Sequence, residues 1–248
     1  MSTIDHSRQD FFIPVDNLKE TTVLIVGCGA IGRNVASNVA RLGVKSITLV
    51  DDDIVENHNI VPQNWQLEQC GKHKVSVLAD EIAAQMGDAV KVQVHPKRWT
   101  PRVVGVDAQF TAVWATVDNI DVRKMLYNYY RDKCDHFFDV RIGASLAQVI
   151  TVKDMRTTND WYLKTIFSSA ESSRFGCVQP MSNYIANIAA GTSVNQFANL
   201  MGGKNWPCNK MLSYCSISST MNVEDPDEYF AALNSTSGDK NTEEQASV

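Results

Sequence analysis

The fold of this chain is decided by residues 23–63, VLIVGCGAIGRNVASNVARLGVKSITLVDDDIVENHNIVPQ. The segment begins with four consecutive apolar residues, which predict a buried strand, and glycines follow directly at positions 27, 29 and 32. In this GxGxxG spacing Gly27 permits a tight turn, Gly29 lets the backbone approach a phosphate, and Gly32 lets the next helix pack against the strand. The first N–H groups of that helix then face an anion.

A second predicted strand, residues 46–50, ends in Asp51, which follows Gly32 by 19 residues. An acid at this place is positioned to accept hydrogen bonds from a ribose. The glycine spacing alone is weak evidence, but the strand before it, the helix after it and the acid together predict a nucleotide-binding Rossmann unit. The alternative is a glycine-rich turn inside an ordinary α/β sheet.

Length and composition predict one globular domain with appendages. The chain has 248 residues, of which 44% are apolar and 21% charged. No apolar run approaches the roughly 18 residues of a membrane span, and the first residues lack the pattern of a signal peptide, so we expect a cytoplasmic protein. The six cysteines are scattered without a CxxC pair, which predicts reduced thiols rather than a disulfide framework or a zinc ribbon.

The net charge of −5 is concentrated at the end of the chain. Residues 222–248 carry seven acids and one base, so the remainder is close to neutral and gives no case for binding nucleic acid. We therefore divide the chain into an N-terminal arm (residues 1–20), a nucleotide-binding domain (21–220) and an acidic tail (221–248) that is expected to be disordered.

The rest of the pattern predicts a Rossmann-like α/β fold. Further strands are expected at residues 90–94, 110–115, 136–140, 147–152 and 211–217, and helices at 72–86, after Asn119 and at 182–201. The strands at 136–140 and 147–152 should be antiparallel, because too few residues separate them for a helical crossover. The prediction is a mostly parallel sheet with helices on both faces and an antiparallel extension.

Two local features point to charged ligands. Asp51, Asp52 and Asp53 place three carboxylates at one strand end, which is unfavourable unless a metal ion or a base lies near them. Lys72 and Lys74 are expected in the first turn of a helix, where the dipole disfavours a positive charge. This placement hints that Lys74 serves a bound anion, although a solvated surface lysine is the alternative.

A longer pattern extends beyond the glycine loop. Its members are, in chain order, the three glycines, Asp51, Asp53, Asn59, Gln63, Gly71, Lys74, Asp118, Asn119 and Arg123. Their combined spacing, within about residues 5–203, resembles the ThiF/MoeB-type adenylyltransferases, the bacterial relatives of ubiquitin-activating enzymes. A dehydrogenase would require only the glycine loop and the first acid.

The resemblance implies an enzyme that uses ATP and Mg²⁺. Members of this family adenylate the C-terminal glycine of a ubiquitin-like modifier or sulfur-carrier protein and release pyrophosphate. The implied nucleotide-binding residues are Gly27, Gly29, Gly32, Asp51, Asp53, Asn59, Gln63 and Lys74. Within this set Asp51 would hold the ribose, Asn59 and Lys74 the phosphates, and Asp118 the magnesium ion.

The N-terminal arm adds one more expected site residue. Arg8-Gln9 resembles the Arg-Gln pair of the family, whose arginine acts across a homodimer interface on the γ-phosphate. The resemblance therefore implies a homodimer in which Arg8 serves the partner's site. A solvated surface arginine is the alternative for Arg8.

The chain departs from the family pattern at two places. Pro62 stands where the family has a phosphate-binding arginine, and the four zinc-binding cysteines of many relatives are not matched, with only Cys177 near a ligand position. Cys177 is also the candidate thiol for a covalent step, with a packing cysteine as the alternative. Pro62 leaves open a catalytically degenerate nucleotide-binding protein that acts as a sensor or heterodimer partner; an NAD-dependent enzyme is a third possibility.

Overall fold

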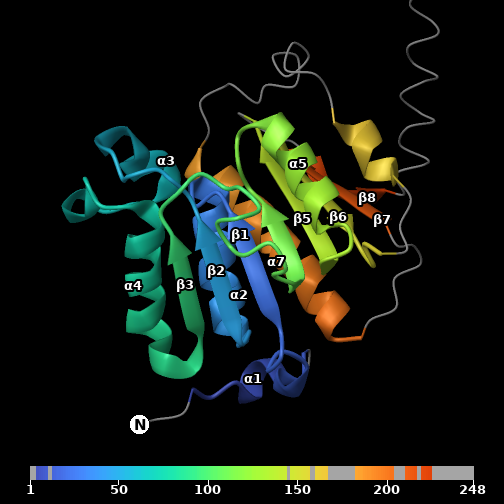
Figure 1. Cartoon of the computed structure of the whole chain (residues 1–248), viewed down its shortest axis with the longest axis horizontal. Coiled ribbons are helices and arrows are strands. Elements are labelled where there is room, and N and C mark those ends of the chain that lie inside the picture. Colours follow the sequence, from blue (N-terminus) through green and yellow to red (C-terminus); the bar gives the residue numbers. More distant parts are fainter. Residues whose placement is uncertain are drawn as a thin grey trace, which may run out of the picture.

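One mixed sheet of eight strands organises the molecule (Figure 1). The computed structural model describes residues 4–10, 13–143, 146–156, 160–166, 182–203, 210–216 and 219–224. The strand order is β3-β2-β1-β4-β5-β6-β7-β8. The strands are β1 (Thr22–Val26), β2 (Ser46–Val50), β3 (Lys91–His95), β4 (Phe110–Ala115), β5 (Cys134–Ile142), β6 (Leu146–Val152), β7 (Lys210–Ser216) and β8 (Ser219–Glu224).

Strand direction confirms the predicted fold class. β3, β2, β1, β4 and β5 pair in parallel, and β6, β7 and β8 continue the sheet with antiparallel pairs. The first antiparallel pair joins β5 to β6 across a connection of only three residues, too short for a crossover helix. The result is a Rossmann-like sheet with an antiparallel extension.

Helices cover both faces of this sheet. The α-helices are α1 (Ser7–Asp10), α2 (Ala30–Leu42), α3 (Ile60–Gln63), α4 (Lys74–Met86), α5 (Ile120–Tyr130) and α7 (Asn183–Met201). Short 3-10 helices are η1 (Val15–Asn17), η2 (Asn57–Asn59), η3 (Leu67–Gln69), η4 (Gly87–Ala89) and η5 (Asp160–Thr165). The helices α2, α4 and α7 pack on one face, and α5 lies on the other (Figure 1).

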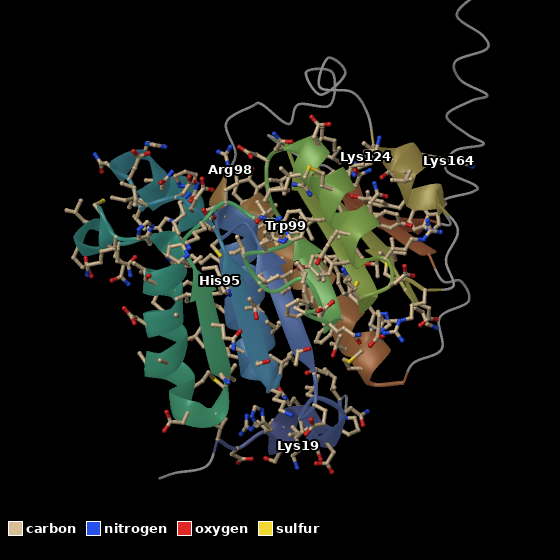
Figure 2. The ribbon with its side chains drawn as sticks, in the orientation of Figure 1. Lys19, His95, Arg98, Trp99, Lys124 and Lys164 are labelled. Carbon is tan, nitrogen blue, oxygen red and sulfur yellow. The ribbon has the colours of Figure 1, made fainter. Side chains whose placement is uncertain are left out.

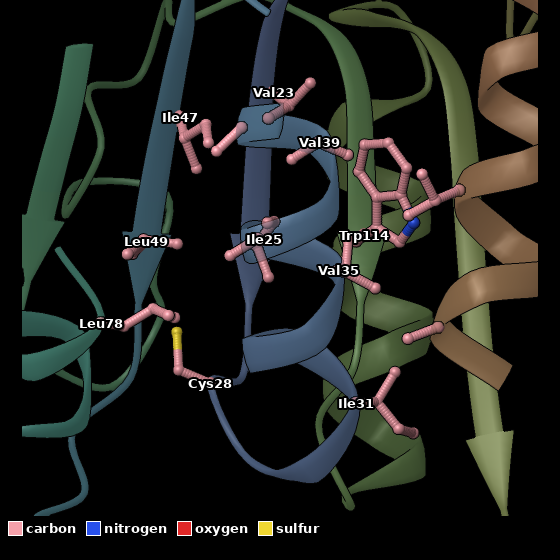
Figure 3. Close-up of a cluster of buried hydrophobic side chains, with 14 of the residues drawn as sticks. Val23, Ile25, Cys28, Ile31, Val35, Val39, Ile47, Leu49, Leu78 and Trp114 are labelled. Carbon is pink, nitrogen blue, oxygen red and sulfur yellow. The ribbon is translucent and has the colours of Figure 1, made fainter. Parts of the chain in front are cut away.

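Alternation along the strands produces two hydrophobic cores. Val23 and Ile25 of β1 point to the face of α2, where Ile47 and Trp114 join them, and Figure 3 shows this cluster. Leu24 and the other alternate residues face α5 and the segment that follows β3. Because successive side chains of a strand point to opposite faces, a central parallel strand covered on both sides is a nearly continuous apolar run.

The described structure refines some of the expected elements. Helix α4 begins at Lys74, so Lys72 precedes the helix instead of lying in its first turn. The segment between Asp53 and helix α4 contains three short helical turns, η2, α3 and η3. Local capping explains η2 and η3, since Glu56 and Gln66 each form a capping box three residues ahead of an amide side chain.

Some expectations lie outside the described residues. These include Cys177 and the acidic tail from residue 225 onward. Within the described part of the chain, no helix has the length and apolar character that crossing a bilayer requires.

Candidate nucleotide-binding site

A cavity of about 610 Å³ opens at the carboxyl ends of the parallel strands. Open α/β sheets bind their ligands at this edge, where the strand order reverses from β1 to β4. The structure brings to its wall most of the residues that the sequence pattern selects. They are Gly27, Gly29, Asp51, Asp53, Gln63, Lys74 and Asp118.

The glycine loop is pressed against the end of β4. Gly27 has φ +95°, and a Cβ atom there would lie 2.9 Å from the backbone of Thr116, so a larger residue is excluded by both conformation and space. A Cβ on Gly32 would lie 1.8 Å from the carbonyl oxygen of Gly27. The start of α2 can therefore pack directly onto the loop, and Gly29 and Ala30 border the cavity. This is the backbone arrangement that presents N–H groups to a phosphate.

Asp51 closes the loop from the neighbouring strand. Its Oδ2 accepts a hydrogen bond of 2.5 Å from the backbone N–H of Cys28, and its Oδ1 accepts one of 2.8 Å from that of Asp53. Burial raises the pKa of Asp51 above its usual 3.8, and the two N–H donors together with Lys74 oppose that shift. The carboxylate is thus held in one orientation at the cavity wall, where hydroxyl groups of a ribose would meet it.

Two cations relieve the crowding of the three carboxylates. Lys74 Nζ lies 2.7 Å from Asp53 Oδ2, and Arg98 Nε lies 3.5 Å from Asp52 Oδ2. Lys74 is only 4% exposed. The protein itself therefore supplies positive charge near these acids, one base from α4 and one from the segment after β3.

Four acids of the cavity wall, Asp51, Asp52, Asp53 and Asp118, are possible ligands of a magnesium ion. One oxygen of each of Asp51, Asp52 and Asp53 lies within 4.8 Å of the others, but each of these carboxylates already has an N–H donor or a cation as partner. Asp118 lines the cavity, is exposed, and has no hydrogen bond or ion pair recorded with any described residue. A free carboxylate of this kind suits a hard divalent cation, so Asp118 fits the predicted role better than the three acids do.

A buried ionic cluster forms the far wall and was not anticipated from the sequence. Asp139 of β5 is fully buried and pairs with Arg123 and Arg141, both of which line the cavity. Tyr162 donates a hydrogen bond of 2.7 Å to the same carboxylate. Burial opposes ionisation of Asp139, yet the two guanidinium groups bring its pKa below the usual 3.8. The sequence signal was the pair of charged residues, Asp139 and Arg141, among the apolar residues of the 137–142 part of β5.

The cluster also connects distant segments. Arg123 donates to the carbonyl oxygens of Ala115 and Val140 at 2.9 and 3.0 Å, and Arg141 donates to that of Thr165 at 2.9 Å. Arg123 therefore ties α5 to the ends of β4 and β5, and Arg141 ties β5 to η5. Arg123 belongs to the family pattern, and in the structure its contacts hold α5 against the ends of β4 and β5.

Other predicted site residues lie away from the cavity. Asn59 is buried in η2, where its Oδ1 accepts a hydrogen bond of 3.0 Å from the N–H of Glu56, and it is not part of the cavity wall. Arg8 is exposed in α1, beside the C-terminal ends of α2 and α4, at the opposite end of the sheet from the cavity. Within one protomer Arg8 cannot take part in the site. Its predicted role therefore requires a partner subunit.

Neither Arg33 nor Lys72 supplies, in the cavity wall, the positive charge that Pro62 lacks. Arg33 pairs with Glu81 at 2.9 Å and stacks over the ring of Trp65, with 4.1 Å between the guanidinium carbon and the ring centroid. Lys72 is exposed and does not line the cavity. Pro62 itself lies in α3, directly before the cavity residue Gln63.

Comparison with known proteins decides the family. The model described as "ThiF family" matches residues 7–229. The chain belongs to the ThiF family. Its fold and the grouping of the motif residues around one cavity agree with that assignment.

Relatives and solved structures extend the comparison. "Adenylyltransferase and sulfurtransferase MOCS3" from Caenorhabditis briggsae is 29% identical over 111 residues, which are 44% of this chain and 28% of that protein. The chain thus spans less than a third of the length of that relative. The structure of PaaA aligns with a TM-score of 0.72 at 19% identity, covering 86% of this chain and 75% of the other. E. coli MccB with ATP aligns with a TM-score of 0.66 at 17% identity, covering 85% and 65%. These structures share the fold of this ThiF-family chain.

Proposed function

We propose that this ThiF-family protein binds ATP and adenylates the C-terminal glycine of a ubiquitin-like modifier or sulfur-carrier protein. The observation that carries the proposal is the assembly of the glycine loop, Asp51, Lys74 and Asp118 around one cavity at the carboxyl ends of the strands. Support comes from the family assignment, from the adenylyltransferase named among the relatives, and from the neighbouring structure that contains ATP.

The proposed reaction is attack of a carboxylate oxygen on the α-phosphorus of ATP. A bond from that oxygen to phosphorus forms, the bond to the bridging oxygen breaks, and pyrophosphate leaves with the electron pair. The N–H groups of the glycine loop and the ammonium group of Lys74 would stabilise the charge on the phosphates, because cations aimed at developing charge lower the barrier. A magnesium ion held by Asp118 would supply further charge stabilisation to the leaving group.

Exchange of labelled pyrophosphate into ATP tests this proposal directly. The assay contains the protein, ATP, Mg²⁺ and a small ubiquitin-like protein that ends in diglycine. We expect exchange that depends on the partner's terminal glycine and is lost in Asp118→Ala. Tight binding of NAD without any response to ATP and Mg²⁺ would contradict the assignment.

Pro62 supports a second candidate function. The proline leaves the family's arginine position without charge, and neither Arg33 nor Lys72 replaces it in the cavity wall. A nucleotide-binding subunit that has lost catalysis and serves as a sensor or a heterodimer partner would bind ATP without exchange. The same assay, combined with calorimetry, separates the two functions.

A thioester step after adenylation would need a reactive cysteine. Cys177 lies outside the described residues, and the described cysteines include Cys28 and Cys134, which are buried. Burial raises the pKa of both thiols, so neither is activated as a nucleophile. If transfer from the adenylate uses a thioester, Cys177→Ala should abolish transfer and leave pyrophosphate exchange intact.

A further inference from the structure

Arg98 is an exposed cation in the wall of the nucleotide cavity. The cavity wall contains four cations among the described residues, and three of them have close partners. Lys74 pairs with Asp53 at 2.7 Å, while Arg123 and Arg141 are buried against Asp139. The side chain of Arg98 is 84% exposed, and its recorded ion pair is the 3.5 Å contact with Asp52. A guanidinium so exposed and weakly paired can reorient toward a ligand.

The backbone that carries Arg98 is firmly anchored. The next residue, Trp99, is 6% exposed, and its ring packs against Tyr129 and Tyr130 of α5 at centroid distances of 5.8 and 6.0 Å. The hydroxyl group of Tyr129 donates a hydrogen bond of 2.6 Å to the carbonyl oxygen of Val106, later in the same segment. Arg98 therefore extends from a fixed point at the cavity edge, and Figure 2 labels it beside Trp99.

The strand order indicates which part of a nucleotide would meet Arg98. In the sheet, β1 with the glycine loop is followed by β2, which ends at Asp51, and then by β3, which leads into Arg98. A nucleotide whose phosphates lie at the glycine loop and whose ribose lies at Asp51 must extend its base toward β3. The ion pair with Asp52, the residue directly after Asp51, keeps Arg98 on this side of the ribose position.

We propose that Arg98 binds the base of the nucleotide by laying its guanidinium plane against the purine ring. The inference rests on the proposed nucleotide site and assigns the base subsite within it. Guanidinium groups suit this role because they are planar, weakly hydrated, and stack on π-systems. Lysine lacks the planar group, so charge alone would not reproduce the contact. Asp52 would orient the guanidinium from its edge and leave its face open to the base.

The experiment compares calorimetric affinities of the full chain for three probes: ATP with Mg²⁺, adenosine, and inorganic tripolyphosphate. The variants are Arg98→Ala and Arg98→Lys, with Arg102→Ala as the matched control, because Arg102 is exposed in the same segment and does not line the cavity. We expect Arg98→Ala to weaken ATP and adenosine equally, by about 5- to 30-fold, the range for losing one stacking cation. Tripolyphosphate affinity should be unchanged, Arg98→Lys should not restore adenosine binding, and Arg102→Ala should match the wild type.

Four results would overturn the assignment. Weaker ATP and tripolyphosphate binding with normal adenosine binding would make Arg98 a phosphate contact, as would full rescue by Arg98→Lys. Unchanged affinity for every probe would leave Arg98 as a partner of Asp52 only. Failure of the proposed function gives a different result. A wild type that binds adenosine and ATP but never exchanges pyrophosphate refutes adenylation. The base subsite is still tested there by the affinities of the Arg98 variants for adenosine. A wild type that binds none of the probes refutes both.

Discussion

Lys74 Nζ lies 2.7 Å from Asp53 Oδ2, yet the lysine side chain is 4% exposed while that of the aspartate is 64% exposed. A helix disfavours a cation in its first turn, and Asp53 offsets this cost. The backbone N–H of Lys74 also donates to the carbonyl oxygen of Asp53 at 3.0 Å. The pair therefore fixes the start of α4 and holds an ammonium group in the cavity wall, where an incoming phosphate could share it.

The first prediction is that Lys74→Met lowers ATP affinity by about 10- to 100-fold, the loss expected for one hydrogen bond to a charged group. Asp53 is solvated, so its carboxylate tolerates the loss of the lysine and the fold should remain intact. Calorimetry measures the affinity, and circular dichroism checks the fold. Lys72→Met is the control, because Lys72 is exposed two residues earlier and outside the cavity wall. Equal affinities in the two variants would remove Lys74 from the site.

A second prediction treats Arg33 as a structural residue. Arg33→Met removes the 2.9 Å pair with Glu81 and the stacking over Trp65. We expect the free energy of unfolding to fall by about 2 to 3 kcal/mol and ATP affinity to remain at the wild-type value. Arg41→Met on the same helix is the control; Arg41 is exposed, so its loss should change stability by no more than about 0.5 kcal/mol. Loss of ATP binding in folded Arg33→Met would instead support a phosphate role.

The third prediction concerns the buried carboxylate of Asp139. Asp139→Asn preserves shape but leaves Arg123 and Arg141 buried without their shared counter-charge. Removing one partner from a buried ionic cluster costs about 3 to 5 kcal/mol. Urea unfolding at neutral pH measures the loss. Tyr162→Phe, which removes one donor to the same carboxylate, should cost less than Asp139→Asn. Comparable losses in both variants would mean that packing, and not charge, holds the cluster.

The sign of the pH dependence follows from the lowered pKa of Asp139. A carboxyl group whose pKa is lower in the folded state stabilises the fold at every pH above its pKa in the unfolded state, here 3.8. This contribution is lost as the pH falls through the pKa of the folded state. The wild type and Asp139→Asn share their other titratable groups, so the difference between their free energies of unfolding isolates Asp139. This difference should be constant above pH 3.8 and should shrink below it. A difference that grows on acidification would contradict the assignment.

The sequence predicted the fold well because the signals for it are local. The apolar runs, the glycine spacing and the short connection between β5 and β6 each act within one or two elements, and they predict the mostly parallel sheet with its antiparallel extension. Most residues of the motif also line one cavity, since the carboxyl ends of parallel strands meet at one edge of the sheet. Lys72 was wrongly placed in α4 because helix boundaries depend on capping, and here the chain turns helical only after His73.

The parts of the site that the sequence did not predict depend on contacts between distant segments. Arg98 meets Asp52, and Arg141 meets Thr165, across 46 and 24 residues, with no periodic pattern to signal either pair. Arg33 was one of the cations available to replace the family's arginine, but Glu81, 48 residues away, holds it elsewhere. A sequence identifies which charged residues exist, whereas the tertiary fold decides which of them are already paired.

The fourth prediction is a symmetric dimer with shared sites. Arg8 lies beside the C-terminal ends of α2 and α4, so it can reach a cavity only in another subunit. We expect light scattering to show a dimer at micromolar concentration. Arg8→Ala and Lys74→Ala should each be inactive, and an equal mixture after subunit exchange should recover about a quarter of the sites, because random pairing in a twofold dimer restores one site in each mixed dimer. No recovery from verified mixed dimers would exclude action across the interface.

The last prediction places an arginine at Pro62. Pro62 is the third of the four residues of α3, where a backbone N–H is not required by the helix, so another residue can adopt the same conformation. It directly precedes Gln63 in the cavity wall, and neither Arg33 nor Lys72 lines that wall. An added cation that stabilises departing pyrophosphate is worth about 2 to 4 kcal/mol, or about 30- to 1000-fold in rate. Pro62→Arg should therefore accelerate pyrophosphate exchange, whereas Pro62→Ala, which relaxes the backbone without adding charge, should not. If the two variants exchange at equal rates, the missing charge is not limiting, and the partner subunit's cations become the candidates that supply it.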